Sequence, residues 1–196
     1  MKLIGITGGV GSGKSEIVRF LQDNYNCRVE FADDVAKRLE EPGGSCFEPL
    51  VELLGKEVLS DGAIDNKKMA AMIFKDETLV SRVNAIVHPK VWDYFEDAVS
   101  LEREKGEIDY FFIEAALLIE CGYEKIVDEL WYVYASKETR KKRLKDARNY
   151  TDEKIDSIFS NQLSDDEFRN HCDFIIDNDK DLDTVLEQIK NRLGGK

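Results

Sequence analysis

The residues with the clearest chemical potential lie near the start of the chain, between Gly8 and Ser15, where the sequence reads Gly-Gly-Val-Gly-Ser-Gly-Lys-Ser. Four glycines in eight positions let the chain wrap around an anion and aim consecutive backbone N–H groups at it. At the end of this loop, Lys14 can reach the β- and γ-phosphates of a nucleoside triphosphate, and the Ser15 hydroxyl can bind Mg²⁺. The spacing therefore predicts a site for a nucleoside triphosphate and Mg²⁺.

The elements on either side of this loop have the order that such a site requires. The apolar run Leu3–Ile6 predicts a strand in front of it, and Ser15–Leu21 predicts a helix behind it. The amino end of that helix adds partial positive charge where the phosphates would lie. ATP is the expected ligand, because the segment 178–181 has the wrong order for a guanine-reading motif. The predicted ATP-binding residues of the loop are Gly9, Gly11, Ser12, Gly13, Lys14, Ser15 and Glu16, the last through its backbone N–H.

A pair of aspartates follows the second predicted strand, Arg28–Phe31. Carboxyl ends of parallel strands meet at one edge of a sheet, so Asp33 and Asp34 are expected at the same edge as the phosphate loop. One of them could accept a proton from a substrate hydroxyl. The alternative is that either aspartate caps a helix that begins at Val35.

Glu114 ends the apolar run that starts at Tyr110. An acid at the end of such a strand can help to hold Mg²⁺, directly or through water. The alternative is an ordinary strand end that faces solvent.

A cationic run from Arg140 to Lys145 stands out in an otherwise acidic chain. Arginine binds phosphate bidentately, and closure over a triphosphate excludes water, so the run predicts a helical lid. The alternative is a solvated helix face with ion pairs between successive turns.

The wider pattern alternates strands with helices. Helices are predicted at Ser15–Leu21, Ser136–Arg148 and Asp181–Leu193. This alternation is typical of a parallel sheet covered on both faces, which binds ligands at the carboxyl ends of its strands. The five predicted strands are short and almost continuously apolar, as buried parallel strands are, and they lie at Leu3–Ile6, Arg28–Phe31, Tyr110–Ile113, Leu130–Tyr134 and Phe174–Ile176.

The alternation stops between about Val35 and Lys105, where apolar residues recur at helical spacing without a convincing strand. This stretch predicts a helical insertion. Within it, Pro89 follows His88 and predicts the first turn of a new helix that runs to Arg103, because proline suits the first helical position.

Composition limits the class of protein. The 196 residues suit one domain, and the net charge of −12 argues against a nucleic-acid partner. No run approaches the roughly 18 apolar residues of a membrane span, and Leu3–Ile6 is too short for a signal segment, so a cytoplasmic protein without a membrane partner is expected. Four scattered cysteines and two histidines lack metal-ligand spacing, which favours reduced, buried thiols.

Further motifs follow the phosphate loop in a fixed order, and with it they resemble the dephospho-coenzyme A kinase family over nearly the whole chain. The resemblance implies a three-layer α/β/α P-loop NTPase fold with a parallel five-stranded sheet. It also implies a nucleotide-binding core at about 1–34, 106–135 and 165–196, a substrate-binding insertion at about 35–105 and a lid at about 136–164. The motifs are Ala32-Asp33, Glu41-Pro42-Gly43, His88-Pro89, the segment from Glu114 to Glu120, Arg143, Gln162 and the segment from Cys172 to Asn178.

The reaction that the resemblance implies is transfer of the ATP γ-phosphate to the ribose 3′-hydroxyl of dephospho-coenzyme A, the last step of coenzyme A synthesis, with Mg²⁺. By position, Asp33 would be the base at the 3′-hydroxyl. Lys14 and Arg143 would be the catalytic cations, and Arg143 would also contact ATP. Ser15 and Glu114 would form the metal site. The implied substrate-binding residues are Asp33, His88, Leu117 and Leu118.

Four positions depart from the family pattern. Phe31 replaces the first aspartate of a pair, Glu16 replaces a threonine and Ala116 replaces a proline. Ala147 stands where a second lid arginine is usual, and the neighbouring Arg148 points about 100° away around a helix. Two alternatives therefore stay open: a P-loop kinase for another nucleotide or nucleoside, and an ATP-binding module without catalysis. A monomer or weak homo-oligomer is expected.

Overall fold

The computed structural model describes residues 1–76, 78–179 and 181–194. The chain divides into two compact units, of which unit 1 comprises Met1–Glu30 and Gly106–Lys196, and unit 2 comprises Phe31–Lys105. None of the helices in the described ranges has the length and apolar character needed to cross a membrane.

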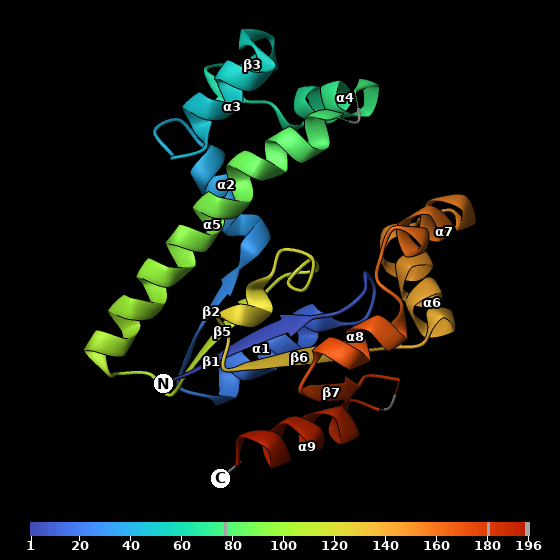
Figure 1. Ribbon diagram of the computed structural model, residues 1–196. Coiled ribbons are helices and arrows are strands. Elements are labelled where there is room, and N and C mark those ends of the chain that lie inside the picture. The colour runs from blue at the N-terminus through green and yellow to red at the C-terminus, as the bar shows by residue number, and fades with distance from the viewer. Residues whose placement is uncertain (77, 180, 195–196) are drawn as a thin grey trace. The chain divides into compact units, whose positions relative to one another are not determined.

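The five predicted strands are confirmed and form one sheet with the order β2-β5-β1-β6-β7 (Figure 1). The ladders β1–β5, β1–β6 and β6–β7 are parallel. Ile6 lies opposite Glu114 on one side and Trp131 on the other, so β1 is a central strand. The strands are β1 (Lys2–Thr7), β2 (Cys27–Phe31), β5 (Tyr110–Glu114), β6 (Glu129–Tyr134) and β7 (Phe174–Asp177).

Helices cover both faces of this sheet. Trp131 and Tyr132 are consecutive in β6, so their side chains point to opposite faces. Tyr132 stacks on Phe168 of α8 (Asp165–His171) with ring centroids 4.6 Å apart. On the other face, Trp131 donates to Glu129, which also binds Arg192 of α9 (Leu182–Leu193). The predicted three-layer α/β/α arrangement is therefore confirmed.

The remaining helices of unit 1 are α1 (Lys14–Asn24), α6 (Lys137–Arg148) and α7 (Asp152–Ser160), with a 3₁₀ turn, η2, at Tyr123–Lys125. Side chains cap the amino ends of four helices and satisfy N–H groups that have no partner within the helix. The capping residues are Ser136 for α6, Thr151 for α7, Ser164 for α8 and Asp181 for α9.

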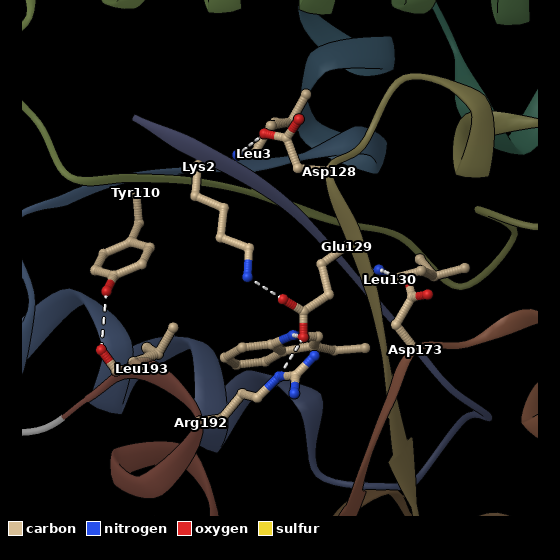
Figure 2. Close-up of polar contacts among 10 residues, drawn as sticks. Lys2, Leu3, Tyr110, Asp128, Glu129, Leu130, Asp173, Arg192 and Leu193 are labelled. Atoms are coloured by element: carbon tan, nitrogen blue, oxygen red, sulfur yellow. Dashed lines mark hydrogen bonds and ion pairs between the residues drawn. The ribbon is translucent and has the colours of Figure 1, made fainter.

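An ionic cluster around the buried Glu129 carboxylate joins α9 to the start of β1 and β6. Glu129 is 3% exposed and accepts hydrogen bonds from Lys2, Arg192 and the Trp131 indole, the last at 2.9 Å. Figure 2 shows the Glu129 carboxylate between the Lys2 and Arg192 side chains. Lys2 and Arg192 lie far apart in the sequence, so this cluster links the last helix, α9, to the first strand, β1.

Unit 2 is mainly helical. Its helices are α2 (Ala32–Glu40), α3 (Phe47–Leu54), the 3₁₀ turn η1 (Lys56–Val58), α4 (Asn66–Lys75) and α5 (Thr78–Lys105). The expectation that this stretch has no strand is wrong in one detail, because β3 (Leu59–Ser60) and β4 (Ala63–Ile64) form a short antiparallel hairpin. Asp61 and Gly62 join them with φ angles of 52° and 82°, as a tight hairpin turn requires.

The predicted start of a helix at Pro89 is also wrong. Pro89 lies inside α5, which continues for 28 residues from Thr78 to Lys105. Val83, Val87 and Val91 are buried at four-residue spacing across this point, whereas Pro89 itself is exposed. Burial of the continuous apolar stripe outweighs the backbone hydrogen bond that proline cannot make.

Candidate functional site

The loop from Gly8 to Gly13 connects β1 to the amino end of α1. Gly13 takes the N-cap position with φ 94°, a left-handed conformation that side chains other than glycine rarely adopt. A Cβ at Gly13 would also collide with the Asn178 amide nitrogen. Backbone conformation and close packing thus both require glycine here.

Lys14 and Glu114, both predicted site residues, lie together beside this loop. The Lys14 Nζ donates to the Gly8 carbonyl oxygen at 2.7 Å and to the Gly9 carbonyl oxygen at 3.4 Å. Glu114, at the carboxyl end of β5, places an Oε1 atom 3.8 Å from the same nitrogen. The Lys14 side chain is thus held over the loop by the carbonyl oxygens of Gly8 and Gly9 and by the half-buried Glu114 carboxylate.

Ser15 and Glu16 are exposed in the first turn of α1. The Glu16 N–H, which was predicted to donate to ATP, donates to the Gly13 carbonyl oxygen at 3.1 Å in this structure. Ser12 is 1% exposed, and its buried hydroxyl has no hydrogen-bond partner in the described part of the chain.

Arg143 of α6 lies against the end of the phosphate loop. Its Nη1 donates to the Ser12 carbonyl oxygen at 3.1 Å, and its Nη2 donates to the Asn178 carbonyl oxygen at 2.9 Å. Asn178 follows β7, is 5% exposed, and donates from its own amide to the Ser12 carbonyl oxygen at 2.6 Å. The sequence pattern included Asn178, but its contact with the loop depends on β7 being placed beside β6.

A second arginine of α6, Arg140, contacts the loop and was not among the predicted site residues. It is 4% exposed, and its Nε donates to the Val10 carbonyl oxygen at 3.1 Å. Gln162, beyond α7, accepts from both Val10 N–H and Arg140. A sequence signal existed, because Arg140 stands four residues before Leu144, the only apolar residue of the basic run, and such residues share a helix face.

Two lysines of the basic run, Lys141 and Lys145, form ion pairs with α7. Lys141 Nζ lies 2.6 Å and Lys145 Nζ 2.9 Å from the Asp152 carboxylate. One face of α6 therefore packs on the phosphate loop, while these lysines bind the neighbouring helix.

The structure rejects the capping interpretation of the aspartate pair in unit 2. Helix α2 begins at Ala32 rather than Val35, its N-cap is Phe31, and no side chain caps it. Asp34 lies in the first turn and its carboxylate is 3.0 Å from Lys37 Nζ. Asp33 is exposed in the same turn, two residues after β2.

The remaining predicted substrate contacts differ in accessibility. His88 of α5 is half-buried in unit 2, and this burial lowers the pKa of its imidazole. Leu117, after β5 in unit 1, is 47% exposed, whereas Leu118 is fully buried. The burial of Leu118 points to packing rather than to contact with a substrate, because a side chain without exposed surface contacts only its neighbours in the core.

The donor set beside the loop suits Mg²⁺ bound together with a phosphate ligand. The Ser15 hydroxyl and the Glu114 carboxylate are the hard oxygen donors that this ion prefers. In the described ranges, no cluster of three or more His, Cys, Asp or Glu side chains could hold a metal by itself. The phosphates would therefore supply further oxygen ligands, as is usual for Mg²⁺ in nucleotide sites.

A glycine-rich loop between a central parallel strand and a helix, with a lysine over the loop, defines a P-loop nucleotide-binding fold. Solved structures agree with this class. The crystal structure of TT1252 from Thermus thermophilus matches with a TM-score of 0.81 and 26% identity, over 98% of this chain and 96% of that one. Shikimate kinase from Acinetobacter baumannii has the same fold at 13% identity, with a TM-score of 0.55 over 99% of this chain and 94% of that one.

Sequence comparison identifies the family within this class. The family model of dephospho-CoA kinase matches residues 2–184. The dephospho-CoA kinase of Streptococcus agalactiae is 34% identical over 197 residues, which cover 98% of this chain and 97% of that protein. The enzyme of the same name from Listeria monocytogenes is 34% identical over 189 residues, covering 96% and 94%. This chain therefore belongs to the dephospho-CoA kinase family, as its motifs predicted.

Proposed function

We propose that the chain transfers the γ-phosphate of ATP to the ribose 3′-hydroxyl of dephospho-CoA, which yields CoA and ADP. The observation that carries the proposal is the loop from Gly8 to Ser15 with Lys14 held over it, in a chain that matches the dephospho-CoA kinase family over nearly its whole length. We further propose that it works in the cytoplasm, as a monomer or weak homo-oligomer, on small molecules alone.

The residues of unit 1 would bind ATP and stabilise the transferred phosphate. Lys14 Nζ donates to two loop carbonyl oxygens, and phosphate oxygens would replace these acceptors with charge-assisted bonds. Arg143 donates to the Ser12 carbonyl oxygen near the other end of the loop, and it would contact the nucleotide from that position. Mg²⁺, held by Ser15, Glu114 and the phosphates, would neutralise charge that develops on the transferring group. The backbone N–H groups from Gly9 to Glu16 would donate the remaining hydrogen bonds to the phosphates.

The acceptor would bind through unit 2 and the segment after β5. Asp33 would orient the 3′-hydroxyl and accept its proton as the oxygen attacks the γ-phosphorus. Exposed Leu117 and half-buried His88 would contact the rest of the acceptor, and Leu118 would support Leu117 from the core. In this proposal the helical unit 2 is the substrate-binding part and the α6–α7 segment is a lid.

The reaction itself is tested by incubating the protein with Mg²⁺ and ATP, with and without dephospho-CoA, and by measuring ADP and the mass of the product. We expect ADP release only with the acceptor, and a product heavier by one phosphate. Phosphorylation of other nucleosides in preference to dephospho-CoA would contradict the proposed acceptor.

The proposed base is tested with Asp33→Asn, and Asp34→Asn is the matched control because it makes the same change one residue away. Loss of a general base lowers turnover by roughly 10²–10⁴-fold. We expect this loss in Asp33→Asn with ATP affinity nearly intact, and near-normal turnover in Asp34→Asn. An Asp33→Asn variant that loses ATP binding would contradict the assigned role.

A further inference from the structure

Among the described residues, Arg140 is the most deeply buried cation that touches the phosphate loop, and the proposed reaction gives it no role. Three groups hold its guanidinium in place. Nε donates to the Val10 carbonyl oxygen at 3.1 Å, Nη2 donates to the Gln162 amide oxygen at 2.6 Å, and the Phe159 ring centroid lies 4.3 Å from its central carbon. With 4% exposure, the side chain is packed closely against the loop.

The surroundings of Arg140 do not match its charge. Its two hydrogen-bond acceptors are uncharged, and burial of a cation among neutral groups is costly. Asp165 acts on it through space, but that carboxylate accepts a hydrogen bond from the Tyr132 hydroxyl at 2.8 Å. Arginine stays protonated even when buried. A buried positive charge from α6 therefore lies against the loop, and it is only partly balanced.

The loop is also shaped around this side chain. A Cβ at Gly9 would overlap the Arg140 guanidinium, so glycine at this position makes room for the arginine. The same Gln162 oxygen that binds Arg140 accepts from the Val10 N–H at 3.3 Å. Arg140 and Gln162 thus hold both polar backbone groups of Val10.

We propose that Arg140 is a positioning residue that, together with Gln162, fixes the phosphate loop at Val10 and adds a permanent positive charge behind it. This inference rests on the proposed binding of ATP. A polyphosphate is the counter-charge that the buried guanidinium lacks, so the effect on affinity should grow with the number of phosphates and vanish for adenosine.

The test measures dissociation constants of ATP, ADP and adenosine by calorimetry for wild type and Arg140→Gln. Arg19→Gln is the matched control, because it makes the same substitution on the exposed surface of α1. We expect Arg140→Gln to weaken ATP binding about tenfold, the effect of roughly one charge-assisted bond, ADP binding less, and adenosine binding less than twofold. Arg19→Gln should stay within about twofold of wild type for all three ligands.

Three outcomes would separate the possibilities. ATP affinity within twofold of wild type in a folded Arg140→Gln variant overturns the inference. An equal loss for ATP and adenosine also overturns it, because that pattern indicates general damage to the site. Wild-type protein that does not bind ATP would instead refute the proposed function.

Gln162→Leu provides a second test that does not depend on the folding of Arg140→Gln. It keeps the positive charge but removes the acceptor that joins Val10 to Arg140. We expect weaker ATP binding, by about threefold or more, with adenosine binding unchanged. Wild-type ATP affinity in this variant would show that Gln162 does not position the loop.

Discussion

Replacement of Glu129 by glutamine should destabilise unit 1 measurably, although the change is nearly isosteric. The carboxylate is buried and accepts from Lys2, Arg192 and Trp131 (Figure 2). Glutamine keeps one oxygen for the Trp131 indole but loses the charge that attracts the two cations. The magnitude of the effect therefore depends on how strongly those cations are screened by water.

The side chains of Lys2 and Arg192 are 44% and 41% exposed, so each lost ion pair is worth at most about 1 kcal/mol. We therefore expect Glu129→Gln to lower the free energy of unfolding by about 1–2 kcal/mol. Glu129→Ala also leaves the buried Trp131 N–H without an acceptor, which adds about 1–3 kcal/mol. The predicted order of stability is wild type, then glutamine, then alanine.

Urea unfolding followed by circular dichroism measures these differences, and Glu187→Gln, an exposed carboxylate on α9, is the matched control. Burial would raise the pKa of Glu129, but hydrogen bonds from Lys2, Arg192 and Trp131 lower it below its usual value. A carboxyl group with a lowered native pKa stabilises the fold above its unfolded pKa and loses this effect as the pH falls through the native pKa. The gap between wild type and Glu129→Gln should therefore narrow below about pH 4. Equal stability of the two proteins at pH 7 would refute the reasoning.

Three further predictions concern the loop and unit 2. Gly13→Ala combines a left-handed φ with a collision against Asn178, so we expect it to destabilise the protein by about 1–3 kcal/mol and to weaken ATP binding, as thermal unfolding and calorimetry would show. Lys14→Met should lower kcat/KM for ATP roughly a hundredfold or more in a steady-state assay, whereas a change below tenfold would argue against its phosphate contact. Burial lowers the pKa of His88, so its neutral form stabilises the fold above about pH 6.5 and this contribution is lost as the pH falls through the lowered native pKa. His88→Gln should therefore flatten the fall in melting temperature between about pH 7 and pH 5, and an unchanged fall in this variant would contradict the reasoning.

Local signals predicted the strands and the loop, because each depends on short-range physics. Continuous apolar runs have to be buried on both faces of a sheet, and the glycines from Gly8 to Gly13 allow backbone angles that other residues resist. The turn at Asp61 and Gly62 was a local signal too. It does not predict a hairpin by itself, because the strands on either side are only two residues long and have no apolar alternation to mark them.

Other features depended on contacts between distant segments. Pro89 does not start a helix as its local preference predicts, because burial of one face of α5 keeps the helix continuous through it. Helix α2 begins at Ala32 rather than at Val35, because the chain passes directly from β2 into the helix. Leu117 and Leu118 look equivalent in the sequence, but only the fold decides that one is exposed and the other is buried.

The sequence by itself determined the type of fold, the phosphate loop and the family, since these follow from periodicity, glycine spacing and the order of motifs. The tertiary structure alone decided which cation of the basic run is buried against Val10, and that Gln162 and Asn178 reach the loop from segments over 140 residues further along the chain. The physical reason is that hydrogen bonding and desolvation depend on where side chains meet in space. Helix periodicity places Arg140 and Leu144 on one face, but only packing shows what that face covers.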